Sequence, residues 1–182
     1  RDRGLTPFMV AHAALAVLLS RLSATEDITV GTPIAGRGQS ILDPMVGMFV
    51  NTLVLRTGVD SSAGFGQLLD DVRRTDLEAF ANADIPFEAV VERVNPLRTE
   101  AYAPLAQVWL AFDQSAIADL ASQTLTIGGG TIGEAGGLAV TPAEPDELSA
   151  RVDLTVGIAD NGDNWQGSVL YATDLYDAES VR

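Results

Sequence analysis

Few residues of this chain could do acid–base or nucleophilic chemistry. Its 182 residues include one histidine, His12, and no cysteine, so thiolate nucleophiles, disulfides and zinc–thiolate sites are excluded. His12 lies inside an apolar stretch, where a single imidazole is more often a satisfied core or interface residue than a general base. A metal site would have to use carboxylates, which are scattered over predicted helix faces. We therefore expect no metal site and no complete catalytic set.

The loops that bind nucleotides or expose a serine nucleophile are also missing. The glycine run Gly128–Gly130 lacks the G-x-G-x-x-G spacing of a dinucleotide-binding loop, and no basic residue lies near it. The sequence has no G-x-S-x-G elbow and no lysine that could serve a Walker loop. An autonomous hydrolase, kinase or dehydrogenase is not supported.

The net charge of -14 restricts the partners of the protein. An acidic surface repels nucleic-acid phosphates and anionic membranes, so we expect neither as a partner. The longest apolar run, Met9–Leu19, is interrupted by His12 and is too short to span a bilayer. With no cysteine and no signal-peptide pattern, a cytoplasmic location is expected. Because the chain opens on Arg1 and stops at Arg182 as a helix begins, we expect a segment of a larger protein.

Elements that could position functional groups follow from the apolar periodicity. Thr6-Pro7 is typical of a helix start, and the helix through Leu22 is apolar nearly all round, so we expect it to be buried against a sheet. Further helices are predicted over 65–81, 86–94 and from 177 onward, and strands over 28–34, 48–56, 106–112, 152–158 and 165–172. This order predicts an α/β two-layer sandwich of a mixed sheet and helices.

Two glycine-containing stretches modify this pattern. Residues 115–149 read as an excursion from the core, a hairpin or an arm, with short strands at 124–127 and 138–141. Asn161-Gly162 predicts a tight turn between the last two strands, which makes them an antiparallel hairpin.

Three segments are too particular to be generic core. In the strand over 48–56, Asn51 interrupts an apolar run. A buried amide costs about 1–3 kcal/mol unless it is hydrogen-bonded, so Asn51 should either bond across strands or face a cavity. In the second segment, Asp84 is expected to cap the helix that Pro86 starts. In the third, a polar loop from Arg98 leads into the strand that carries Gln107.

Together these segments resemble signatures of the condensation domain of nonribosomal peptide synthetases, and more narrowly of its C-terminal lobe. The first matches G-x-F-V-N-T, the second matches the end of H-Q-D-x-P-F-E, and the third is similar to R-x-x-x-R-x-P-L-F-Q. The resemblance covers nearly the whole chain. The motif residues are Gly47, Phe49, Val50, Asn51 and Thr52, then Asp84, Pro86, Phe87 and Glu88, then Arg98, Pro104 and Gln107, with Asp153 as a recurrent aspartate of structural role.

The resemblance implies that residues 1–182 form one lobe of a fold similar to chloramphenicol acetyltransferase. Such domains form an amide between aminoacyl or peptidyl thioesters, each held on the phosphopantetheine arm of a carrier protein. The implied partners are the N-terminal lobe, donor and acceptor carrier proteins and neighbouring synthetase domains, with no cofactor bound directly. The family's H-H-x-x-x-D-G motif belongs to the other lobe, so this fragment has no catalytic residue and should be inactive alone. Asn51 would face the reaction tunnel and bind substrate.

Departures from the motifs keep a second function open. Asn82-Ala83 replaces the family's His-Gln, Tyr102-Ala103 replaces Arg-His, and Ala106 replaces Phe. These changes favour a degenerate condensation-like domain that serves as a docking platform for a tailoring enzyme. The intact motif from Gly47 to Thr52 favours amide formation, and its F-V-N-T form argues against an epimerization or cyclization relative.

Overall fold

The computed structural model describes residues 3–38, 40–42, 44–97, 99, 101–113, 133–135, 138–140, 149–160 and 164–182. The chain divides into two compact units, Arg1–Leu110 and Ala111–Arg182, which are considered in turn. The predicted strand at 124–127 and the Asn161-Gly162 turn lie outside the described residues, as does most of the predicted excursion over 115–149.

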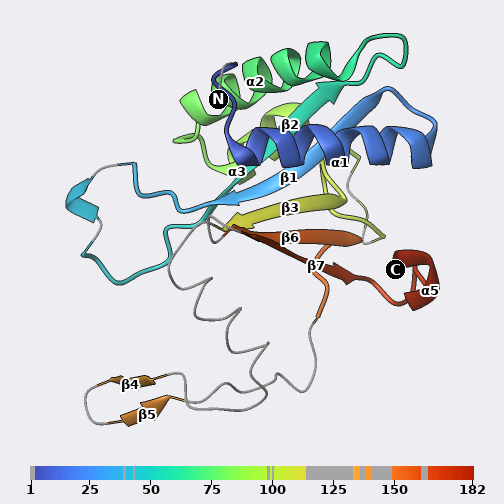
Figure 1. Cartoon of the computed structure of the whole chain (residues 1–182). Coiled ribbons are helices and arrows are strands. Elements are labelled where there is room, and N and C mark those ends of the chain that lie inside the picture. Colours follow the sequence, from blue (N-terminus) through green and yellow to red (C-terminus); the bar gives the residue numbers. More distant parts are fainter. Residues whose placement is uncertain are drawn as a thin grey trace. The chain divides into compact units, whose positions relative to one another are not determined.

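The first unit contains a mixed sheet with helices packed on it (Figure 1). Strand β1 pairs antiparallel with β2 along its whole length, from Asp27 opposite Gly58 to Ile34 opposite Asn51, and runs parallel to β3 where Gly31 meets Trp109. Helices α1 and α2 pack on each other and on β1 and β2. The predicted mixed α/β arrangement is confirmed. In chain order the elements are α1 (Pro7–Ser23), β1 (Asp27–Ile34), the 3-10 turn η1 (Ser40–Leu42), β2 (Asn51–Gly58), α2 (Phe65–Ala81), α3 (Phe87–Val94) and β3 (Val108–Asp113), which crosses the boundary between the units.

Helix α1 begins where the sequence predicts. The Oγ1 of Thr6 accepts a hydrogen bond from the backbone N–H of Met9, and Pro7 occupies the first helical position. The helix packs against the sheet as expected, but not on every side, because Leu18 and Leu22 are 53% and 76% exposed. The helix contacts the sheet and α2 on one side only, and its buried residues are Met9, Ala11, His12, Ala13, Leu15 and Ala16.

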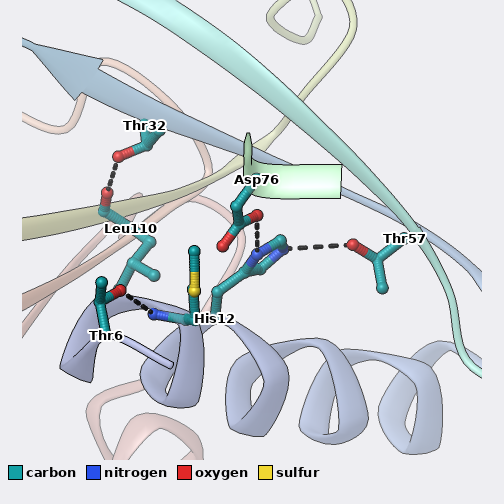
Figure 2. Close-up of polar contacts among 7 residues, drawn as sticks. Thr6, His12, Thr32, Thr57, Asp76 and Leu110 are labelled. Carbon is teal, nitrogen blue, oxygen red and sulfur yellow. Dashed lines mark hydrogen bonds and ion pairs between the residues drawn. The ribbon is translucent and has the colours of Figure 1, made fainter. Parts of the chain in front are cut away.

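A buried polar cluster joins α1, α2 and β2 (Figure 2). The Nδ1 of His12 lies 2.8 Å from the Oδ1 of Asp76, and its Nε2 lies 3.4 Å from the Oγ1 of Thr57. His12 and Asp76 are both 0% exposed. An ionised carboxylate has no hydrogen to donate, so with Asp76 ionised the Nδ1–H donates to it. His12 is therefore a satisfied core residue, as its surroundings in the sequence predict.

The contact between β1 and β3 depends on a glycine. A Cβ on Gly31 would lie 2.6 Å from the Nε1 of Trp109, so the indole occupies the space that a side chain would need. One residue further along, the Oγ1 of Thr32 donates to the carbonyl oxygen of Leu110 at 2.8 Å (Figure 2). Both contacts fix the parallel register of the two strands.

The second unit contains β4 (Gly133–Ala135), β5 (Leu138–Val140), β6 (Leu154–Asp160), β7 (Trp165–Tyr171) and α5 (Ala178–Val181). Strands β6 and β7 form the predicted antiparallel hairpin, with Leu154 opposite Tyr171 and Asp160 opposite Trp165. The short strands β4 and β5 pair antiparallel, so β5 confirms a strand within the predicted 138–141 stretch. In the described part of the chain, no helix has the length and apolar character needed to cross a membrane.

Removing one partner of the buried His12–Asp76 pair should destabilise the fold strongly. We expect Asp76→Ala to lower the free energy of unfolding by about 3–5 kcal/mol, because it leaves the imidazole buried without its partner. Urea unfolding followed by circular dichroism measures this change.

Asp71→Ala is the matched control, because it removes a carboxylate from the same helix. The Oδ1 of Asp71 accepts a hydrogen bond from Arg74 at 2.8 Å, and the side chains of Asp71 and Arg74 are 34% and 66% exposed. We expect Asp71→Ala to lower the free energy of unfolding by about 0–1 kcal/mol. Equal losses in the two variants would contradict a structural role for the buried pair.

An exposed ion pair at the end of the β1–β2 ladder should make a small, pH-dependent contribution. The Nη2 of Arg56 lies 2.6 Å from the Oδ2 of Asp27, and this hydrogen bond holds the pKa of the Asp27 carboxyl below its usual value of 3.8. A lowered pKa means that the contribution is present above the unfolded pKa and is lost as the pH falls through the folded one.

The variant Asp27→Asn should therefore unfold at a slightly lower temperature than the wild type at neutral pH. The difference should shrink below about pH 4, because the wild-type carboxylate then becomes protonated. Thermal unfolding over a pH series measures it, and a difference that persists unchanged into strong acid would contradict this assignment.

Candidate functional site

The side chain of Asn51 is the centre of the candidate site. It lies at the first residue of β2 and is part-buried. Its Nδ2 donates to the carbonyl oxygens of Ala83 and Ile85, at 3.0 and 2.9 Å, and its Oδ1 accepts from the backbone N–H of Phe87 at 3.1 Å. The amide thus has hydrogen-bond partners, which accounts for a polar group in an apolar run.

These bonds correct the predicted cap of α3. The N-cap residue before the helix is Pro86, with φ -60, and its position gives no side-chain cap hydrogen bond. Asp84 is exposed and does not cap the helix, so that prediction is wrong. The free N–H at Phe87 is satisfied instead by Asn51, 36 residues earlier in the chain. A cap from a neighbouring strand cannot be recognised from local sequence.

A groove of about 560 Å³ opens beside Asn51. It is bordered by the end of β1 with the loop after it, by the residues that lead into β2, and by the connection between α2 and α3. Asn51 therefore borders a cavity, as one of the two predicted alternatives has it, while its hydrogen-bond partners lie in the α2–α3 connection and not across strands. The groove is lined by Ile34, Ala35, Gly36, Arg37, Gly38, Phe49, Val50, Asn51, Ala83, Asp84, Pro86 and Glu88.

Two glycines let the backbone approach closely at this groove. Gly36 has φ +62, and a Cβ there would lie only 1.7 Å from the carbonyl oxygen of Phe49. Gly36 is therefore required both by its left-handed backbone and by the close contact with the main chain of Phe49, just before β2. A Cβ on Gly47 would lie 3.1 Å from the Phe49 ring, so this motif glycine leaves room for the aromatic side chain.

Strand β2 begins later than predicted. The prediction of a strand from Met48 is wrong by three residues, because β2 begins at Asn51. Met48 and Val50 are 85% and 57% exposed, so this part of the apolar run covers no core in the described chain. Thr52 pairs with Pro33 in the ladder and contributes to the sheet.

The third motif lies at a second hollow on the other side of α3. This hollow measures about 430 Å³, and Phe87, Glu88, Tyr102 and Pro104 are among its lining residues. Glu88 therefore borders both cavities. Among the predicted site residues, Phe87 and Glu88 of the second motif and Pro104 of the third line this same hollow.

Backbone geometry is unusual within the third motif. The N–H of Ala106 bonds the carbonyl oxygen of Pro104 at 2.8 Å, and Leu105 between them has φ +67, which is the geometry of a strained three-residue turn. The Nε2 of Gln107 donates to the carbonyl oxygen of Ala103 at 2.9 Å, so this motif residue braces the turn. Arg98 lies outside the described residues.

Asp153 belongs to the second unit, where its main-chain carbonyl oxygen accepts a hydrogen bond from the N–H of Ala172 at 3.0 Å, next to the β6–β7 hairpin. The structural role that the resemblance implies for its side chain stays a prediction.

The charged groups at the groove are Arg37, Asp84 and Glu88. Among the described residues, no cluster of three or more histidine, cysteine, aspartate or glutamate side chains could hold a metal ion. Sequence reasoning did not single out Arg37. The available signal was its place between two glycines directly after a strand, where a long side chain can reach back over a neighbouring loop.

The mixed sheet, its helices and the groove at the end of β1 and β2 define an α/β domain with a cleft beside a motif asparagine. The chain belongs to the condensation domain family, whose sequence model, described as "Condensation domain", matches residues 1–182. This finding confirms the family that the three motifs predict.

Relatives among curated proteins are much longer. The probable non-canonical nonribosomal peptide synthetase CymA of Salinispora arenicola is 44% identical over 187 residues, which cover 100% of this chain and 2% of that protein. The isonitrile lipopeptide synthase of Mycobacterium tuberculosis is 39% identical over 187 residues, covering 100% of this chain and 7% of that protein. The chain therefore spans only a small part of the length of these relatives.

Solved structures with the same fold include two of particular interest. Holo-AB3403, a four-domain nonribosomal peptide synthetase bound to AMP and glycine, matches 98% of this chain and 14% of its own, with a TM-score of 0.84 and 27% identity. The X-domain from teicoplanin biosynthesis matches 99% of this chain and 39% of its own, with a TM-score of 0.79 and 25% identity. These matches confirm the predicted fold class.

Loss of the Asn51 amide should destabilise the region around α3. We expect Asn51→Ala to lower the free energy of unfolding by about 1–3 kcal/mol, because one N–H and two carbonyl groups lose their partner. Asn51→Asp should not restore stability: it can still accept from Phe87, but it places a carboxylate against the carbonyls of Ala83 and Ile85. Urea unfolding measures both variants.

Asn82→Ala provides a control with the same change of side chain. The Nδ2 of Asn82 donates to the carbonyl oxygen of Glu78 at 2.8 Å, a local and exposed contact at the end of α2. We expect Asn82→Ala to lower the free energy of unfolding by much less than Asn51→Ala does. Similar losses would show that the contacts of Asn51 with the α2–α3 connection contribute little.

Proposed function

We propose that this chain is the C-terminal lobe of a condensation domain that forms amide bonds in a nonribosomal peptide synthetase, a cytoplasmic enzyme. The observation that carries the proposal is the intact motif around Asn51, placed beside an open groove in a chain that belongs to this family over its whole length. The partners are the N-terminal lobe, donor and acceptor carrier proteins and neighbouring synthetase domains.

In the proposed reaction, the acceptor amine attacks the carbonyl carbon of the donor thioester. A C–N bond forms, the C–S bond breaks, and the thiol leaves with the proton that the amine gives up. Both substrates are thioesters on phosphopantetheine arms of carrier proteins, so the domain itself binds no cofactor. The one histidine of this chain is buried and bonded to Asp76, which supports the proposal that the group accepting the proton belongs to the N-terminal lobe.

The hydrogen bonds of Asn51 limit how it can act on substrate. Both N–H groups of its amide are used, whereas the Oδ1 accepts one hydrogen bond and keeps a second lone pair. A direct contact with substrate would therefore use Oδ1 as an acceptor, from an N–H such as that of the attacking amine. Asn51 is proposed to position substrate in this way rather than to transfer a proton.

Departures in the second and third motifs support a rival function. With Asn82-Ala83, Tyr102-Ala103 and Ala106 at motif positions, the domain would bind a tailoring enzyme and form no amide. The X-domain from teicoplanin biosynthesis, one of the solved structures with this fold, has also been solved as a complex with OxyB. An OxyB-like partner is therefore the kind of protein that this second function would recruit.

Amide formation by the full-length protein tests the proposal. With donor and acceptor substrates loaded on their carrier proteins, we expect mass spectrometry to detect the condensation product. The isolated 182-residue chain should give no product above a control without protein. Product from the isolated chain would contradict the assignment of catalysis to the missing lobe. No product from the full-length protein, together with retention of a tailoring enzyme, would favour the docking function.

A further inference from the structure

Phe49 lines the groove at the end of a segment that has little side-chain packing to hold it in place. This segment, residues 44–49, lies between the 3-10 turn η1 and β2 and is called the wall segment. Within it, Met45 and Met48 are 51% and 85% exposed, and Val46 is fully exposed. Apolar side chains directed at solvent do not fix a backbone. The wall segment must therefore be held by contacts of its main chain and of Phe49.

Arg37, which lies on the loop after β1, makes several of these contacts. Its Nη1 donates to the carbonyl oxygen of Met45 at 2.8 Å and also to that of Leu42. Its guanidinium carbon lies 4.4 Å from the centroid of the Phe49 ring. One planar cation thus holds two main-chain carbonyls and the ring. A lysine ammonium could not make the same set, because it lacks a planar face and paired donors.

The preceding residue brings Arg37 within reach. The close approach of Gly36 to the carbonyl oxygen of Phe49 places the end of β1 directly against the wall segment. Arg37 and Phe49 both line the groove together with Asn51. A shift of the guanidinium would therefore change the position of Phe49, and with it the space beside the amide.

We propose that Arg37 is a positioning residue for amide formation, which fixes Phe49 and the wall segment as one side of the groove that Asn51 borders. The inference rests on the proposed function, since it assigns Arg37 to the groove in which the reacting groups would lie. Arg37 acts through Phe49 and the main chain and does not touch the reacting atoms.

The test uses the full-length protein with carrier-loaded substrates. Arg37→Ala should lower kcat for the condensation product by about ten- to a hundredfold, because small misplacements of a reaction site have effects of this size. Arg37→Lys should recover only part of the loss. If Arg37 acts through the aromatic ring, Arg37→Ala should lower kcat by a smaller factor in a Phe49→Leu background than in the wild type. The effects of the two substitutions on kcat should therefore not multiply.

Arg56→Gln is the matched control, because it removes an arginine whose exposed ion pair with Asp27 lies at the other end of β2. It should leave kcat near the wild-type value, and thermal unfolding of every variant should show whether Arg37→Ala loses more stability than this control.

Four results would overturn the inference: wild-type kcat in Arg37→Ala, a loss confined to KM, effects of Arg37 and Phe49 that multiply independently, or a loss of kcat explained by unfolding. Because the wild-type reaction tests the proposed function by itself, failure of that reaction is distinguishable from failure of the Arg37 variants.

Discussion

The first unit depends on a buried polar contact between its two longest helices. His12 on α1 and Asp76 on α2 are both inaccessible to water, and Thr57 on β2 completes the cluster. In the described part of the chain, the Oδ2 of Asp76 has no hydrogen-bond partner, so the carboxylate relies on the imidazole. A buried polar pair is satisfied in one geometry only, whereas apolar contacts tolerate sliding. The pair therefore sets how the helices lie on the sheet, and so where the strand ends that carry the groove are held.

At the groove, too, a polar side chain fixes the geometry through its hydrogen bonds, and here that side chain is Asn51. Asn51 satisfies groups of the α2–α3 connection that no residue of that connection satisfies by itself. The amide is thus part of the frame of the groove as well as one of its lining groups. Within the described part of the chain, its Oδ1 accepts one hydrogen bond, so one residue can frame the groove and still present a lone pair toward it.

The sequence predicted the elements well where apolar periodicity and end signals agree. The bounds of α2 and the start of α1 at Thr6-Pro7 are as expected, and the β6–β7 hairpin follows its turn signal. The family followed from three motifs in series. Asp76 was missed, although it falls four residues after Val72 on the apolar stripe of α2, where a carboxylate needs a partner. The cap of α3 and the contacts of Arg37 were out of reach, because both join residues through tertiary structure that local patterns do not encode.

The origin of the α3 cap has a consequence for the order of folding. An eight-residue helix is too short to be stable alone, and this one begins at a proline with no local side chain to satisfy its first amide. The missing bond comes from β2, which is ordered by its ladder with β1. We therefore expect helix α3 to become stable only after the strand pair has formed. The two hollows beside it should then take shape later than the core of the first unit.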